Sequence, residues 1–147
     1  MTEDRALDIL LIEDNPGDIR LFQEAFKEFH KPNNLYLSPD GEDAMSFLLR
    51  QGRHAATPRP DLILLDLNLP KKDGREVLAE IKRDQGLKTI PLVIFTTSQM
   101  EQDIADCYGL HANCYIKKPI GIKDYLDAVR SIESFWLNLV KLPPKAD

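Results

Sequence analysis

The 147-residue sequence predicts one α/β domain with a doubly wound parallel sheet, and two observations support this fold class. First, strand-like and helix-like segments alternate about five times along the chain. Second, the strand-like segments are nearly continuous apolar runs, and the clearest is 61–66 with its consecutive aliphatic residues. Such runs are typical of strands that helices bury on both faces.

The first half of the chain begins with an apolar strand that ends at Glu13-Asp14. Asn15-Pro16 then predicts a helix start, because Asn is a good N-cap and proline suits the first helical position. Ile19, Phe22, Phe26 and Phe29 follow at helical spacing and are expected to face the core. The expected elements are a strand over 7–12, this first helix, an edge strand over 34–38, a helix over 42–50, a loop over 51–60 and a strand over 61–66.

The second half continues the alternation and ends with a long helix. The expected elements are a helix over 73–83, a strand over 91–96, a helix over 100–108, a strand over 113–116 and a helix over 122–140. Ser98 is expected to cap the helix over 100–108. The last helix carries Leu126, Val129, Ile132, Trp136 and Leu139 along one side, and Pro143-Pro144 ends it.

Five parallel strands of this kind fit the flavodoxin-like order 2-1-3-4-5, in which ligands lie beyond the carboxyl ends of the strands. Polar residues follow four of the five predicted strands: Glu13 and Asp14, Asp66, Thr96 and Thr97, and Lys117 and Lys118. If the fold is right, these side chains meet at one edge of the sheet.

Clustered carboxylates repel one another unless a cation lies among them, so the arrangement predicts a bound divalent ion. Oxygen ligands suit Mg²⁺, which keeps several waters and commonly works with phosphate. A lysine and hydroxyls across the site suit the oxygens of a phosphoryl group. The pattern therefore indicates attack by a carboxylate on phosphorus. Taken alone, Asp66 would more readily be explained as a strand-end acid held by loop amides; Asp14, Thr96 and Lys118 reverse that preference.

The composition excludes several other classes of protein. A net charge of −5 argues against nucleic-acid binding, which draws on clustered Lys and Arg. No apolar run approaches the roughly 20 residues of a membrane-spanning helix. Cys107 and Cys114 form no metal-binding or disulfide pattern, so we interpret them as reduced core residues of a cytoplasmic protein.

Four motifs together resemble the receiver domains of two-component response regulators: Glu13-Asp14, Asp66-Leu-Asn68-Leu-Pro70 with Asp73-Gly74, Thr96, and Lys118-Pro119. The resemblance spans about residues 7–135. It implies that Asp66 is the phosphoacceptor and that Asp14 is a direct Mg²⁺ ligand. Glu13, in place of the commoner Asp, would act on the metal through a water, and Asn68 would offer its backbone carbonyl.

The resemblance also implies roles around the phosphate. Lys118 would contact the phosphoryl group, and the Lys118–Pro119 bond would be cis. Thr96 would turn toward the phosphate on activation, while Tyr115 rotates inward as the aromatic switch. Thr97 supplies a second hydroxyl at this edge, although it could instead belong to a helix cap.

The 51–60 loop, the segment 66–81 and Glu133-Ser-Phe-Trp136 resemble the small regulators that partner phytochrome-type histidine kinases. The resemblance implies a stand-alone receiver over 1–147, with an extended C-terminal helix, a short tail and no output domain. Such a protein takes a phosphoryl group from a sensor histidine kinase and signals to a downstream protein or a phosphotransfer domain. It is not a conventional enzyme, but it catalyses its own phosphorylation and dephosphorylation.

Two other functions and one subunit contact are also compatible with parts of the sequence. A phosphatase with an aspartyl nucleophile would need an acid two residues after it, where this chain has Asn68. A degenerate docking receiver would be expected to lack the acids or the lysine. Phe135 and Trp136 could pack on their own sheet, but the apolar continuation of their helix favours a homodimer.

Overall fold

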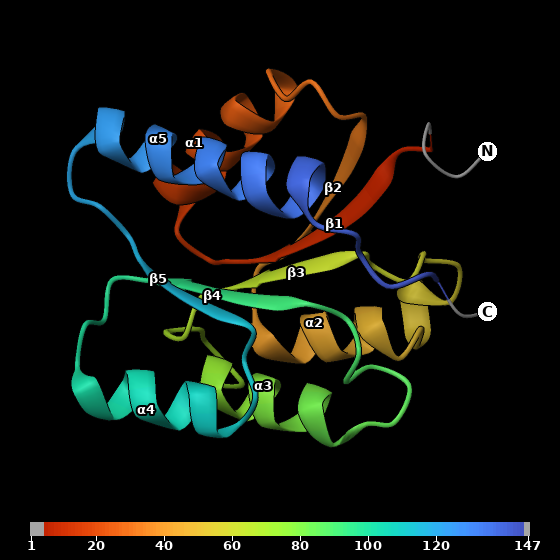
Figure 1. Ribbon diagram of the computed structural model, residues 1–147. Coiled ribbons are helices and arrows are strands. Elements are labelled where there is room, and N and C mark those ends of the chain that lie inside the picture. Colours follow the sequence, from red (N-terminus) through yellow and green to blue (C-terminus); the bar gives the residue numbers. More distant parts are fainter. Residues whose placement is uncertain (1–4, 146–147) are drawn as a thin grey trace.

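The computed structural model describes residues 5–145 and confirms the predicted fold, a five-stranded parallel sheet of order β2-β1-β3-β4-β5 (Figure 1). The strands are β1 (Leu7–Ile12), β2 (Asn33–Ser38), β3 (Leu62–Leu65), β4 (Leu92–Thr96) and β5 (Cys114–Lys117). The α-helices are α1 (Pro16–Lys27), α2 (Gly41–Leu48), α3 (Gly74–Arg83), α4 (Glu101–Gly109) and α5 (Ile122–Ile132). A 3₁₀ turn (Gly52–His54) lies in the expected 51–60 loop.

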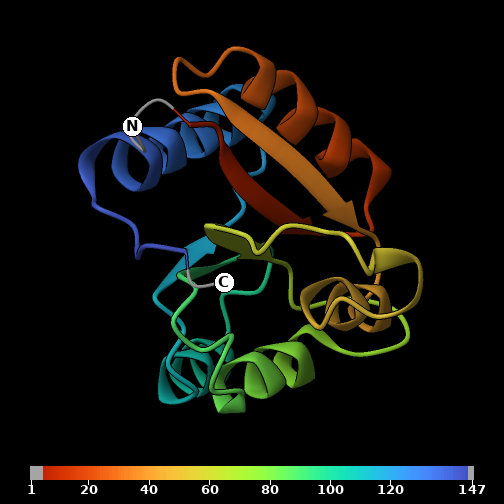
Figure 2. The same cartoon turned by 90° about the vertical axis from the view of Figure 1, so that its right-hand side faces the viewer.

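Helices cover both faces of the sheet, with α1 and α5 on one face and α2, α3 and α4 on the other (Figures 1 and 2). Successive side chains of a strand point to opposite faces. In β1, Leu10 and Ile12 therefore join the core under α2, α3 and α4, while Ile9 and Leu11 join the core under α1 and α5. This is why the strands read as continuous apolar runs. No helix among residues 5–145 is long and apolar enough to span a membrane.

Side-chain caps start three of the helices. The Asn15 side chain accepts the Asp18 backbone N–H at 3.0 Å, with Pro16 in the first helical turn as predicted. Asp40 caps α2 and Asp73 caps α3 in the same way. The prediction that Ser98 caps α4 is wrong, because Met100 holds the cap position and the Ser98 hydroxyl donates to Asp103 instead.

The predicted single helix over 122–140 is also wrong in its second half, where a π-helix spans Glu133–Leu139. Glu133 is buried, and its carboxylate accepts the backbone N–H groups of His30 at 2.7 Å and Lys31 at 3.3 Å. A π turn holds more residues than an α turn, so the side chains after it change faces. Leu137 is consequently buried, whereas Leu139, expected on the apolar side, is 72% exposed.

A buried carboxylate also ties the chain together at the amino ends of the strands. Asp61 pairs with Arg5 at 2.7 Å and accepts the Asp8 backbone N–H at 2.8 Å, and Lys145 pairs with Asp8. Burial alone would raise the pKa of Asp61, but the hydrogen bonds from Arg5 and Asp8 outweigh burial and lower it overall.

Candidate functional site

The backbone of the sheet brings the polar residues of the strand ends to one edge. The Asp66 N–H donates to the Ile12 carbonyl at 3.0 Å, which holds the end of β3 beside the end of β1. On the other side of the site, the Lys118 N–H donates to the Thr96 carbonyl at 2.7 Å. Residues that follow four different strands therefore lie at the same edge of the sheet, as pairing between parallel strands requires.

Three carboxylates form a cluster at this edge, since oxygens of Glu13, Asp14 and Asp66 all lie within 4.8 Å of one another. Glu13 and Asp66 are buried, and Asp14 is exposed. Burial and the charge of Asp66 raise the pKa of Glu13 to about 7, even though Lys118 acts in the opposite direction. Burial and the neighbouring carboxylate thus both disfavour the charged form of Glu13.

Lys118 is the cation of the site and is only 5% exposed. Its ammonium donates to Asp18 Oδ2 at 2.6 Å, to Glu13 Oε1 at 2.8 Å and to Asp66 Oδ2 at 3.3 Å. Burial alone would lower the pKa of Lys118, but the hydrogen bonds to Asp18 and Glu13 outweigh it and raise the pKa. One ammonium thus balances several acids, and Lys118 stays charged.

The cluster fits a divalent metal on the chemistry of its donors. All three side chains offer hard carboxylate oxygens, the ligands that Mg²⁺ and Mn²⁺ prefer. Their oxygens converge within 4.8 Å, close enough to share one cation. Asn68 lies exposed beside the cluster, with its backbone N–H 3.4 Å from Asp66 Oδ1.

The hydroxyls and the aromatic residue predicted for the site lie around β4 and β5. The Thr96 hydroxyl is buried and makes no hydrogen bond within residues 5–145. Thr97 is exposed and lines a groove together with Asp18 and Lys118. The Tyr115 hydroxyl donates to the Ser98 carbonyl at 2.9 Å, so the loop after β4 is tied to β5.

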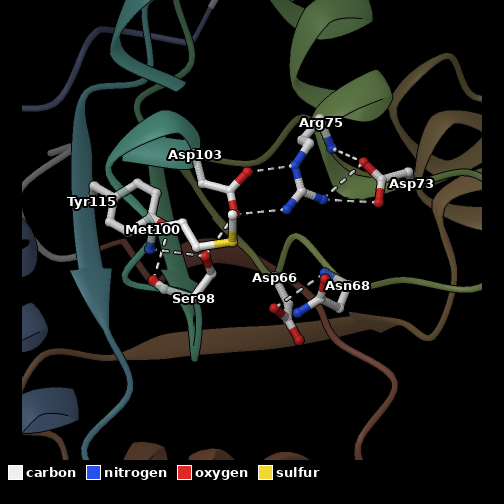
Figure 3. Close-up of polar contacts among 8 residues, drawn as sticks. All are labelled: Asp66, Asn68, Asp73, Arg75, Ser98, Met100, Asp103 and Tyr115. Carbon is white, nitrogen blue, oxygen red and sulfur yellow. Dashed lines mark hydrogen bonds and ion pairs between the residues drawn. The ribbon is translucent and has the colours of Figure 1, made fainter. Parts of the chain in front are cut away.

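A second polar network extends this tie to α3 and α4 (Figure 3). Arg75 donates to both oxygens of Asp103, at 3.0 and 2.9 Å, and also to Asp73, the N-cap of α3, at 3.1 Å. Asp103 in turn accepts the Ser98 hydroxyl at 2.6 Å. Hydrogen bonds from Arg75 lower the pKa of Asp103. The loop after β4, whose Ser98 carbonyl accepts from Tyr115, is therefore connected through Asp103 and Arg75 to α3.

Two other expectations concern residues away from this network. Phe135 is 46% exposed, whereas Trp136 is partly buried against the core under α1 and α5, and their ring centroids lie 5.1 Å apart. The expected cis bond between Lys118 and Pro119 is wrong here, because no peptide bond within the described residues is cis. The trans form is the ordinary state even before proline.

The sequence reasoning missed three charged residues that shape the site. Asp18 lies in the first turn of α1, four residues after Asp14. Arg75 and Asp103 each lie in the first turn of a helix. The helix dipole favours the acid Asp103 at that position but not the base Arg75. Position at a helix start was the available signal, but it does not identify the partner.

The chain is similar to known proteins over most of its length. A family model described as "Response regulator receiver domain" matches residues 9–130. The chain is 54% identical over 135 residues, 92% of each chain, to "Response regulator Rcp1" of Synechocystis sp. (strain ATCC 27184 / PCC 6803 / Kazusa).

Two solved structures are similar over nearly their whole length. The Mn²⁺-bound form of response regulator Rcp1 has a TM-score of 0.92 and 53% identity, over 94% of this chain and 99% of that one. The phosphorylated cyanobacterial phytochrome response regulator RcpA has a TM-score of 0.93 and 51% identity, over 95% and 100%. The predicted resemblance to regulators of phytochrome systems is confirmed. With the sheet order, the acidic edge and these matches in agreement, the chain belongs to the response regulator receiver-domain family.

Proposed function

We propose that this chain is a stand-alone response regulator that accepts a phosphoryl group on Asp66 from a sensor histidine kinase. One observation carries the proposal: Asp66 is buried at the carboxyl edge, within 4.8 Å of two other acids and 3.3 Å from the Lys118 ammonium. Like Glu13, Asp66 belongs to the carboxylate cluster and also contacts the lysine, and it is Asp66 that matches the phosphoacceptor position of receiver domains. A phosphoryl group placed there meets both.

In the proposed reaction an Asp66 oxygen attacks phosphorus, and the bond from phosphorus to the donor nitrogen of a phosphohistidine breaks. Mg²⁺, which Asp14, Asp66, Glu13 and the Asn68 backbone carbonyl would hold, would neutralise charge on the phosphoryl oxygens when bound. Lys118 offers its N–H groups to the same oxygens. Hydrolysis later returns the Asp66 carboxylate and inorganic phosphate, so the protein catalyses both its own phosphorylation and its own dephosphorylation.

The proposed signal passes through Thr96 and Tyr115. The Thr96 hydroxyl is buried without a hydrogen bond within the described residues, so a phosphoryl oxygen would supply the acceptor that it lacks. Movement of Thr96 would disturb the loop whose Ser98 carbonyl accepts from Tyr115. Tyr115 would then turn inward, and the surface of α4 and β5 would change its affinity for a partner.

The proposed partners follow from the relatives. One similar structure is a phytochrome response regulator, which supports a phytochrome-type histidine kinase as donor. A downstream protein or a phosphotransfer domain would receive the signal. We further propose that residues 1–147 act as one receiver, in the cytoplasm.

The test of the phosphoacceptor is intact-mass measurement after incubation with acetyl phosphate and Mg²⁺. We expect a single phosphoryl adduct on the wild type and none on Asp66→Asn. Asp84→Asn is the matched control, because Asp84 ends α3 away from the site, and this variant should still form the adduct. An adduct that persists in Asp66→Asn, or its absence from the wild type, refutes the proposal.

We also propose a homodimer through α4 and α5 or the π-helix that extends α5. Phe135 is the better residue for testing it, because it is 46% exposed while Trp136 packs on its own core. Phe135→Ala should shift the protein toward monomer in sedimentation velocity, and Leu49→Ala, 42% exposed at the end of α2, should not. A wild type that sediments as a monomer with or without phosphorylation removes this idea.

A further inference from the structure

We propose that Asp18 is a positioning residue that restrains Lys118 and so weakens the hold of the site on a phosphoryl group. The proposal rests on the proposed function of Asp66. Its basis is that Lys118 makes its shortest contact, 2.6 Å, with Asp18, and its longest of the three, 3.3 Å, with Asp66. The ammonium is thus held by a carboxylate that is not the phosphoacceptor.

The start of α1 fixes Asp18 in this place. Its backbone N–H is held by the Asn15 cap at 3.0 Å, and Pro16 begins the helix. The Asp18 side chain is 21% exposed, and Lys118 is 5% exposed, so water competes weakly for their contact. A charge-assisted hydrogen bond of this length in a partly buried setting is strong enough to compete with another anion.

Asp18 differs from the other carboxylates that contact Lys118. Glu13 and Asp66 both belong to the cluster whose oxygens converge within 4.8 Å, and Asp18 does not. A divalent cation would therefore draw on Glu13 and Asp66 but leave the contact between Asp18 and Lys118 in place. Asp18 also adds negative charge beside the position of the phosphoryl oxygens, which disfavours another anion there.

The test uses Asp18→Asn, which keeps the shape of the side chain and removes its charge. The probe is beryllofluoride, a mimic of the phosphoryl group, titrated by calorimetry at saturating Mg²⁺. We expect its dissociation constant to fall roughly five-fold, the size of one partly exposed ion pair. The affinity for Mg²⁺ alone should change less than two-fold, because Asp18 lies outside the carboxylate cluster.

Two matched variants separate this role from a general charge effect. Glu24→Gln removes one charge from an exposed position of the same helix and should leave both affinities unchanged. Asp18→Glu restores the charge and should return the beryllofluoride affinity toward the wild-type value. Thermal unfolding of each variant establishes that it is folded before titration.

The outcomes are distinct. An unchanged or weaker beryllofluoride affinity in Asp18→Asn overturns the proposal, and so does an equal gain in Mg²⁺ affinity or in Glu24→Gln. If the wild type binds no beryllofluoride and forms no adduct with acetyl phosphate, the proposed function itself has failed. If the wild type passes both tests and only the Asp18→Asn effect is missing, the role of Asp18 alone is wrong.

Discussion

Arg75→Ala is expected to destabilise the protein by removing the link between α3 and α4 (Figure 3). The Arg75 guanidinium makes two hydrogen bonds to Asp103, at 3.0 and 2.9 Å, and two to Asp73, at 3.1 and 3.2 Å. The Asp103 side chain is only 12% exposed. Truncation of Arg75 therefore leaves the largely covered Asp103 carboxylate with the Ser98 hydroxyl as its remaining side-chain donor.

The magnitude follows from the burial of the two partners. A hydrogen bond to a charged group is worth about 1.5–3 kcal/mol when it is well shielded. The Arg75 side chain is 34% exposed, so solvent screening reduces the value of its contacts. We expect a loss of about 2 kcal/mol in the free energy of unfolding. For a domain of this size, that lowers Tm by about 4–8 °C.

Urea denaturation followed by circular dichroism measures the loss, provided that the m-value stays constant. Arg130→Ala is the control, because Arg130 pairs with Glu28 and Asp127 in solvent at 51% exposure and should cost less than about 0.5 kcal/mol. Equal effects of the two substitutions would contradict the role given to the buried pair. A loss below about 0.5 kcal/mol in Arg75→Ala would contradict it as well.

Three further substitutions test other parts of the structure. Because the pKa of Asp61 is lowered on folding, its charge stabilises the fold at pH values above the unfolded-state pKa, and this stability is lost as pH falls through the folded-state pKa. Asp61→Asn should therefore differ most from wild type near neutral pH. A difference in urea midpoints that stays constant down to pH 2 contradicts this. Gly74→Ala should cost several kcal/mol, because its Cβ would lie 2.3 Å from the Asp66 carbonyl oxygen, and a variant with wild-type Tm refutes this packing. Thr96→Val should change stability by less than about 1 kcal/mol, because its hydroxyl makes no hydrogen bond within residues 5–145, whereas a larger loss would reveal a missed partner.

The sequence made the sheet and the composition of its polar edge predictable. Continuous apolar runs such as 7–12 and 61–66 identify strands buried on both faces, and parallel strands bring their carboxyl ends together. The sequence therefore predicts one polar edge that contains Glu13, Asp14, Asp66 and Lys118.

Tertiary structure decided which of these charges meet. The sequence contains Asp18, Arg75 and Asp103, but nothing local shows that Asp18 contacts Lys118 or that Arg75 contacts Asp103 across 28 positions. It also contains Glu133, whose buried contacts with the backbone of His30 and Lys31 accompany the change from α-helix to π-helix. Apolar periodicity is a property of one segment and is readable from it. The partner of a charge depends on the position and rotation of a second element, so only the folded chain determines it.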